Sequence, residues 1–383
     1  MNRPTLKVVV TGASSDLGLI LAHMISKGDL FGLDQWLDLV LVEHGSKLKQ
    51  VRTGCLPELM TCNPRLVRKY WCTSSMDQAF TDADVIFLAS GTPPSHGLSR
   101  NDIIGTNALE SRAFGQALNR VAKSSVKIVV IMDPQNTNLA VLSYFTPELK
   151  PCNMTALSRV DQNRASTMIA RMLNIANDKV TNVTMWGNRS QDIFPDIRHA
   201  TVDLLGRTMP AYDAVKDDFY LKYKFIELLQ NRDGDIQRKH KSHTHLTTAV
   251  ATVQHTRDWL LGTKPGQWTS MIVISDGSYG IEKGLPFSFP VKVTTPGEWE
   301  IAQGLHLNYY EADKLMERAL EVKNERHFAY SILQLAEAQV SVKEDEEGEV
   351  EKAKATTWHF GHADPIPCSI LGPLERERMG SSM

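Results

Sequence analysis

Short, mainly apolar segments alternate with helical segments through the first 150 residues, and this alternation limits the possible folds more than any other feature. Four runs rich in Val, Ile and Leu lie at residues 6–10, 37–42, 85–89 and 126–131. Brief runs of this kind are typical of strands buried on both faces of a parallel sheet. Residues 17–27 and 102–123 carry apolar side chains at helical spacing. The pattern predicts β-α units with right-handed crossovers and a doubly wound α/β domain over residues 1–150.

The pattern changes from about Pro151 onward. The expected elements are amphipathic stretches at 158–175 and 214–260, a strand at 180–186, a strand pair at 271–275 and 287–293, and a helix near 310–338. Strands and helices are mixed here instead of alternating regularly. We therefore expect a second, α+β domain over residues 151–339.

Residues 340–383 differ in composition from both of the expected domains. The acidic run at 344–347 cannot bury apolar surface, so we expect disorder or a solvated helix end there. The distal stretches 358–362 and 365–367 supply aromatic side chains and prolines, which suit a peptide that orders on a partner's surface. We expect an acidic spacer followed by an interaction tail. The alternative is that the tail folds back onto its own globular part.

Composition excludes several classes of protein. A formal net charge of −2 offers no overall field to attract nucleic acid or an anionic membrane. No apolar run approaches the roughly 18 to 20 residues that cross a bilayer, and no signal-peptide core follows Met1, so we expect a cytoplasmic protein. The five cysteines include no Cys-x-x-Cys pair, which argues against a disulfide framework and a zinc-thiolate site.

The turn after the first strand has a nucleotide-binding pattern. Gly12 and Gly18 end a strand and open a helix, where backbone N–H groups and the helix dipole favour a diphosphate. Ser15 holds the position where a further glycine lets the backbone approach the diphosphate, so NAD should bind weakly or not at all. Glu43 ends the second strand, where a carboxylate accepts ribose hydroxyls and repels the 2′-phosphate of NADP. Glycine turns and acidic strand ends also occur without nucleotides.

Two arginines open the helical stretch at 158–175. Arg159 and Arg164 point in different directions on a helix, so one can face a cleft while the other serves structure. Arginine grips carboxylates with two parallel hydrogen bonds. The alternative is a solvated helix start.

Three histidines at positions 240, 243 and 245 raise the question of zinc. No cysteine or acid accompanies them, and residues two apart do not share a helix face. We expect no metal, and a polar pocket wall or surface in its place.

Several segments together resemble the cytosolic-type malate dehydrogenases over about residues 5–338. They are Val10 to Ala13, Phe31 to Gln35, Pro134 with Asn136 to Asn138, Ser158 to Ala165, Trp186 to Asn188, and Val273 to Gly280. The resemblance implies a Rossmann NAD-binding domain joined to a substrate domain. It also implies a homodimer that interconverts malate and oxaloacetate.

The resemblance also implies roles for single residues. Arg159 matches the arginine that pairs with the substrate's distant carboxylate, Asp161 the aspartate that orients the catalytic histidine, and Asn136 an active-site asparagine. Arg100 matches an arginine of the loop that closes over substrate, and Asn107 falls in the cofactor site.

Position 189 departs from the family. The family motif is Trp-Gly-Asn-His-Ser, and this chain has Arg189 in place of the histidine that accepts the substrate's proton. Imidazole titrates near the working pH, whereas guanidinium stays protonated. Loss of general acid–base catalysis costs about 10²–10⁴ in rate. The loop at 93–100 also lacks the family's arginine pair, and His96 has no orienting partner that would make it a replacement base.

We therefore expect a malate dehydrogenase fold with a degenerate active site. The chain resembles the divergent malate dehydrogenase 1B-like branch, associated with cilia and sperm, which also lacks the motif histidine. This implies a non-catalytic structural or interaction protein, with axonemal or microtubule-associated partners bound through the tail. The alternatives are a weak NAD-dependent oxidoreductase acting on malate or another 2-hydroxy acid, and nucleotide sensing without turnover.

Overall fold

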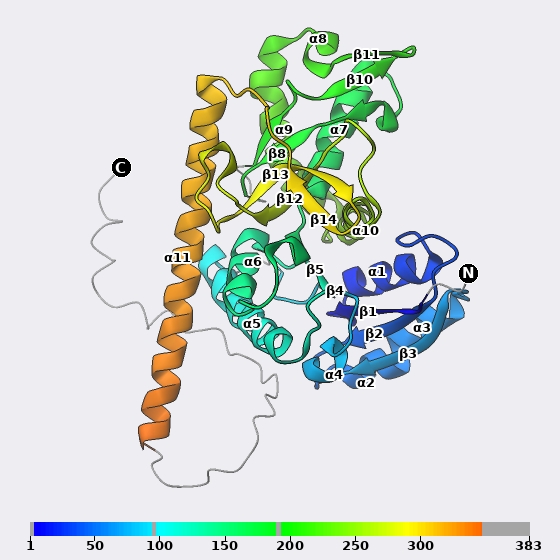
Figure 1. Ribbon diagram of the computed structural model, residues 1–383, viewed down its shortest axis with the longest axis vertical. Helices are drawn as coiled ribbons and strands as arrows, with labels where there is room; N and C mark the ends of the chain where they lie inside the picture. The colour runs from blue at the N-terminus through cyan, green and yellow to red at the C-terminus, as the bar shows by residue number, and fades with distance from the viewer. Residues whose placement is uncertain (1–3, 94–96, 189–192, 347–383) are drawn as a thin grey trace.

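A computed structural model describes residues 4–93, 97–188 and 193–346 of the chain, with side chains to residue 336. Within these ranges, nine strands form one large sheet in the order β14-β13-β12-β6-β5-β4-β1-β2-β3 (Figure 1). Their bounds are β1 Leu6–Thr11, β2 Leu37–Val42, β3 Val67–Thr73, β4 Val85–Leu88, β5 Lys127–Val130, β6 Met154–Ala156, β12 Thr269–Ile274, β13 Pro286–Thr295 and β14 Glu298–Ile301.

The parallel part of this sheet confirms the predicted doubly wound fold. Strands β1 to β6 are parallel and lie in the order 3-2-1-4-5-6, with the reversal between β1 and β4. Val8 and Val10 pack on one face of the sheet and Val9 on the other, and all three are fully buried. Residues buried on both faces of a sheet need no polar side chains, which explains the run of three valines at 8–10.

Helices cover both faces. One face packs against α1 (Asp16–Lys27), α3 (Leu56–Thr61) and α10 (His245–Leu261), and the other against α4 (Met76–Phe80), α5 (Arg100–Val121) and α6 (Gln135–Tyr144). The short helix α2 (Leu48–Gln50) leads through a π-helical turn at Val51–Cys55 into α3.

The expected strand pair near residues 271–293 exists, but it extends the first sheet. Ile272 of β12 pairs antiparallel with Ala156 of β6, and β13 and β14 follow at the edge. The sheet is therefore continuous across the boundary expected near residue 150.

Two predicted elements of the second half are divided in the structure. The strand expected at 180–186 is β7 (Val180–Thr181) followed by β8 (Thr184–Trp186), which belong to different sheets. The stretch 214–260 contains several helices, broken where Lys216 and Lys241 adopt positive φ. The remaining elements of this region are α7 Arg159–Leu173, β9 Phe194–Asp196, β10 Thr201–Leu204, β11 Arg207–Pro210, α8 Ala211–Val215, a π-helical turn Tyr220–Lys224 and α9 Phe225–His240.

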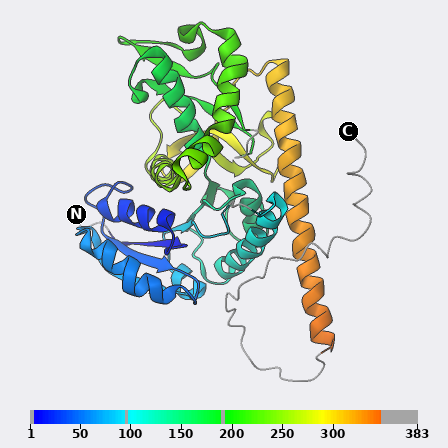
Figure 2. The same ribbon diagram turned by 180° about the vertical axis from the view of Figure 1, so that it is seen from behind.

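Helix α11 (Tyr309–Glu346) runs lengthwise along the molecule and contacts β9 and β13 of the second half as well as α5 and α6 of the first (Figures 1 and 2). It is longer than the helix expected at 310–338, because the acidic segment to Glu346 continues it as a helix end. Leu315, Val322, Ala329 and Leu333 form its buried stripe. Among the described residues, no helix is both long and apolar enough to cross a membrane.

Candidate active site

The strand order of the large sheet reverses between β1 and β4, which pair directly with each other. The Thr11 hydroxyl oxygen accepts hydrogen bonds from the backbone N–H groups of Ala89 and Ser90 at 3.0 and 3.2 Å, which joins the two strand ends. A Cβ atom on Gly12 would lie 2.8 Å from the Ser90 Cα, and one on Gly18 would lie 2.3 Å from the Gly12 carbonyl oxygen. Both positions therefore require glycine. Open α/β sheets bind ligands at such a point of reversal.

Ser15 caps the helix that starts from this turn. Its hydroxyl accepts from the Gly18 N–H at 3.0 Å and donates to the Gly12 carbonyl at 2.7 Å. The hydroxyl thus satisfies one of the unpaired N–H groups at the start of α1.

Glu43 reaches the same turn from the end of β2. One carboxylate oxygen accepts from the Ser14 N–H at 2.8 Å and the other from the His44 N–H at 2.9 Å. Its side chain is buried. The Ser14 N–H, in the turn where a diphosphate would bind, is therefore already hydrogen-bonded to the Glu43 carboxylate.

A second acid, Glu110 on α5, lies near this turn, where it contacts Ser90. Sequence reasoning did not identify it. Burial raises the pKa of its carboxyl to about 7, and the negative charge of Glu43 adds to that effect, while a hydrogen bond to Ser90 opposes it. Glu110 stands three residues after Asn107 and four before Phe114, both buried. A charged residue on the apolar face of a predicted helix was the signal that would have identified it.

Asn107 joins the loop that follows β4 to the loop that follows β5. Its amide nitrogen donates to the carbonyls of Thr92 and Asp133 at 3.0 and 2.5 Å, and its side-chain oxygen accepts from the Thr92 N–H at 2.8 Å. The side chain is fully buried. The structure gives Asn107 a role in loop positioning, and its assignment to the cofactor stays a prediction.

Glu325 of α11 brings three site segments together. Its carboxylate accepts from Arg100 Nε at 2.7 Å, from the Thr137 hydroxyl at 3.2 Å and from the Asn188 amide at 3.3 Å. These partners belong to the start of α5, to α6 and to the turn after β8. Arg100, expected to face substrate, is thus ion-paired with an acid 225 positions away in the chain.

Asn136 lies on the same side of the sheet. Its amide nitrogen donates to the carbonyls of Gly187 and Pro286 at 3.2 and 3.0 Å. Gly187 forms an isolated bridge with Ser288, whose hydroxyl donates to Ser158 at 2.9 Å. The end of β8, strand β13 and the residue before α7 therefore meet, and the assignment of Asn136 to an active site stays a prediction.

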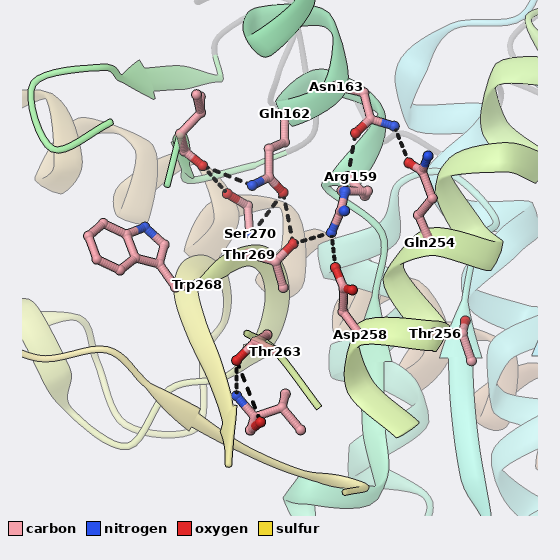
Figure 3. Close-up of polar contacts among 12 residues, drawn as sticks. Arg159, Gln162, Asn163, Gln254, Thr256, Asp258, Thr263, Trp268, Thr269 and Ser270 are labelled. Carbon is pink, nitrogen blue, oxygen red and sulfur yellow. Dashed lines mark hydrogen bonds and ion pairs between the residues drawn. The ribbon is translucent and has the colours of Figure 1, made fainter. Parts of the chain in front are cut away.

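The two arginines of α7 have different partners, and Figure 3 shows Arg159 among Asp258, Asn163 and Thr269. Its guanidinium pairs with Asp258 of α10 at 2.5 Å and donates to Asn163 at 3.1 Å and to Thr269. Its side chain is 17% exposed. The network joins α7, α10 and β12, and the assignment of Arg159 to the substrate carboxylate stays a prediction.

Arg164 is the arginine that contacts Asp161. Its Nη1 lies 3.0 Å from the buried Asp161 carboxylate, and its Nη2 lies 2.5 Å from Asp233 of α9. Gln230, one turn before Asp233, donates to the Ile193 carbonyl at 3.2 Å. The cluster therefore lies beside the segment that follows the Trp-Gly-Asn turn.

Some predicted residues lie outside the described part of the chain: Arg189, His96 and all of residues 347–383. The rings of His243 and His245 lie 5.5 Å apart, and burial lowers the pKa of His245. In the described ranges, no three His, Cys, Asp or Glu side chains are arranged to hold a metal ion.

The family comparisons cover almost the whole described chain. Residues 6–154 match the lactate/malate dehydrogenase NAD binding domain, and residues 158–331 match the lactate/malate dehydrogenase alpha/beta C-terminal domain. Cytoplasmic malate dehydrogenases of Gallus gallus and Homo sapiens are each 36% identical, over 332 and 337 residues. These alignments span 86% and 88% of this chain and 99% and 100% of the relatives.

Solved structures give the same result. Malate dehydrogenase from Naegleria fowleri superposes with a TM-score of 0.81 at 28% identity, over 87% of this chain and 100% of that one. Trichomonas vaginalis lactate dehydrogenase in complex with NADH and oxamate superposes with a TM-score of 0.82 at 31% identity, over 86% of this chain and 100% of that one.

Proposed function

The chain belongs to the lactate/malate dehydrogenase family, and on that premise we propose that it has lost dehydrogenase turnover and acts as a structural or interaction protein. The observation that carries the proposal is Arg189, which stands where the family motif has its histidine. Removing a hydride from a 2-hydroxy acid requires a group that takes the hydroxyl proton. A guanidinium has no proton-accepting state in proteins.

In this proposal Arg164, and not Arg159, is the guanidinium of the site. Arg164 shares its cluster with Asp161, the aspartate that the resemblance places beside the catalytic group. Arg159 is held by Asp258, Asn163 and Thr269 on the other side of α7. Helical geometry turns residues five apart by roughly 140° relative to each other, so the two side chains serve different neighbours.

The backbone of the turn after β1 suits a dinucleotide, whereas the acidic side chains near this turn disfavour its binding. Gly12 and Gly18 provide the close-approach turn, while Glu43 and Glu110 bring two carboxyl groups to the place of an anionic diphosphate. When bound, NAD would supply the hydride acceptor. We propose that NAD binds weakly, and that it binds more tightly than NADP because Glu43 repels a 2′-phosphate.

The alternative function is weak NAD-dependent oxidation of malate or another 2-hydroxy acid. It is favoured by the persistence of Arg100, Asn136, Asp161 and Arg164 in converging segments. Nucleotide sensing without turnover is a third candidate, since the turn after β1 has Gly12 and Gly18.

The proposed partners and location rest on the resemblance to the malate dehydrogenase 1B-like branch and on the composition of the tail. We propose a division into a cofactor-type domain at 1–150, a substrate-type domain at 151–339 and an interaction tail at 340–383, within one continuous sheet. Homodimers form through the globular part and axonemal or microtubule-associated proteins bind the tail. The protein is then cytoplasmic, with the ciliary axoneme as its destination.

The test is a malate oxidation assay on the purified full chain, with a thermal shift titration of NAD, NADH and NADP. We expect background turnover, a small shift with NAD and a smaller one with NADP. Arg189→His should not restore full activity, because the family's arginine pair in the loop at 93–100 is absent as well. Native turnover of about 1–10³ s⁻¹ would refute the proposal, and a preference for NADP would refute the role of Glu43.

A further inference from the structure

The Arg164 guanidinium is already occupied by two acids of its own chain. Its Nη1 faces Asp161 at 3.0 Å and its Nη2 faces Asp233 at 2.5 Å. A guanidinium offers its N–H donors as a planar fork, and a carboxylate ligand binds across two of them. Both terminal nitrogens of Arg164 thus already contact a carboxylate.

Asp233 is held in this position by further contacts. The same oxygen that faces Arg164 accepts from the Thr244 hydroxyl at 2.9 Å, and the other oxygen accepts from Gln237 at 3.3 Å. Thr244 is the residue that precedes α10, and Gln237 lies one turn along α9. These contacts hold the Asp233 carboxylate in one position between α9 and the start of α10.

Asp161 and Asp233 differ in exposure, which separates their roles. The Asp161 side chain is 9% exposed and belongs to the same helix as Arg164, whereas the Asp233 side chain is 37% exposed and comes from a different helix. An incoming anion from solvent therefore competes with Asp233 and not with Asp161.

We propose that Asp233 is an internal substitute for a substrate carboxylate: it occupies the outer edge of Arg164 and excludes small 2-hydroxy or 2-oxo acids from the site. The inference rests on the proposed function, since it explains how the site excludes substrate. Arg100 has a parallel arrangement, because Glu325 pairs with it. The ligand class that Asp233 excludes is a small carboxylate.

Malonate binding to the purified full chain, measured by calorimetry, tests this. Asp233→Asn keeps the size of the side chain and removes its charge, so we expect malonate to bind this variant roughly ten- to hundredfold more tightly than it binds the native chain. Asp235→Asn is the matched control, since Asp235 lies on the same helix and pairs with the exposed Arg238. It should leave malonate binding unchanged.

The double variant Asp233→Asn with Arg164→Gln locates the effect. It should lose the binding gained by Asp233→Asn, and thermal unfolding checks that each variant folds. The proposal is overturned if folded Asp233→Asn binds malonate no better than the native chain, or if the double variant keeps the gain. Calorimetry involves no turnover, so malate oxidation by the native chain would refute the proposed function without deciding this result.

Discussion

At the residue scale, acids from the same chain neutralise the arginines around the site. Glu325 pairs with Arg100, and Asp233 pairs with Arg164, each from a helix distant in sequence. An enzyme that binds anionic substrates keeps such cations available to them. Arg100 and Arg164 are each balanced by an acid of the same chain, which agrees with the proposal that the site is closed to anions.

Glu110 should make stability depend on pH. Its pKa in the folded chain is about 7, above the ordinary value of 4.5, so the unfolded chain ionises first and the folded state loses stability as pH rises from about 4.5 to 7. Glu110→Gln should therefore stabilise the protein by about 1–2 kcal/mol at pH 8 and by little at pH 5. Urea unfolding at both pH values measures the difference.

Glu148→Gln is the control for that experiment, because Glu148 is exposed. It should unfold like the native chain at both pH values. Equal stabilisation by Glu110→Gln at pH 5 and pH 8 would contradict the raised pKa of Glu110.

Arg159 should matter for stability and not for ligand binding. Arg159→Gln leaves Asp258 without its ion-pair partner at 2.5 Å, so we expect a loss of about 1–3 kcal/mol in urea unfolding. Arg171→Gln, at an exposed position of the same helix, should change stability by less than about 0.5 kcal/mol. In the Asp233→Asn background, Arg159→Gln should leave malonate affinity unaltered. A large loss of affinity would return the carboxylate role to Arg159.

At the element scale, α11 connects the two halves of the chain. Leu315 packs in the cluster that contains Trp186 and Phe289, whereas Ala329 and Leu333 pack with Ile104 of α5. Between them, Glu325 reaches three segments of the site. A single helix therefore stabilises both halves and positions the residues between them.

The buried stripe of α11 predicts a clear contrast between two leucines. Leu315→Ala should lower the free energy of unfolding by about 2–5 kcal/mol, because the side chain is 1% exposed and its loss leaves a cavity. Leu320→Ala, at a position 58% exposed on the same helix, should change it by less than about 0.5 kcal/mol. Similar losses in denaturant unfolding would show that the exposed face of α11 is also covered, by another protomer or by the tail.

At the scale of the whole molecule, the central sheet passes through both halves. The antiparallel strands β12, β13 and β14 extend the parallel strands at β6, so the halves share one sheet and the two core clusters on its faces. We expect the globular part to unfold cooperatively, with residues 340–383 outside that unit.

Truncation from Val340 onward separates the two hypotheses for the tail. If the tail binds a partner, co-sedimentation with purified axonemes should be lost, while the melting temperature of the protein barely changes. Denaturation and co-sedimentation of the native and truncated chains are compared side by side. A strong fall in melting temperature with association intact would instead identify the tail as a strap on its own globular part.

Local sequence determined the parallel core and the nucleotide-type turn. The strands around Val9 and Ile86 were predicted because burial on both faces demands uniformly apolar segments, and Gly12 and Gly18 because a close backbone approach excludes a Cβ atom. The fold class and the family were therefore readable before any tertiary contact was known.

Tertiary structure decided the rest, because these features depend on neighbours distant in the sequence. Helical spacing places Arg164 beside Asp161, three residues earlier, and turns Arg159 away from it, but only the placement of α9 and α10 brought Asp233 to Arg164 and Asp258 to Arg159. The pairings of Asp233 with Arg164 and of Glu325 with Arg100 span 69 and 225 positions. Charge pairing over such separations leaves no local pattern, since the packing of helices brings the partners together.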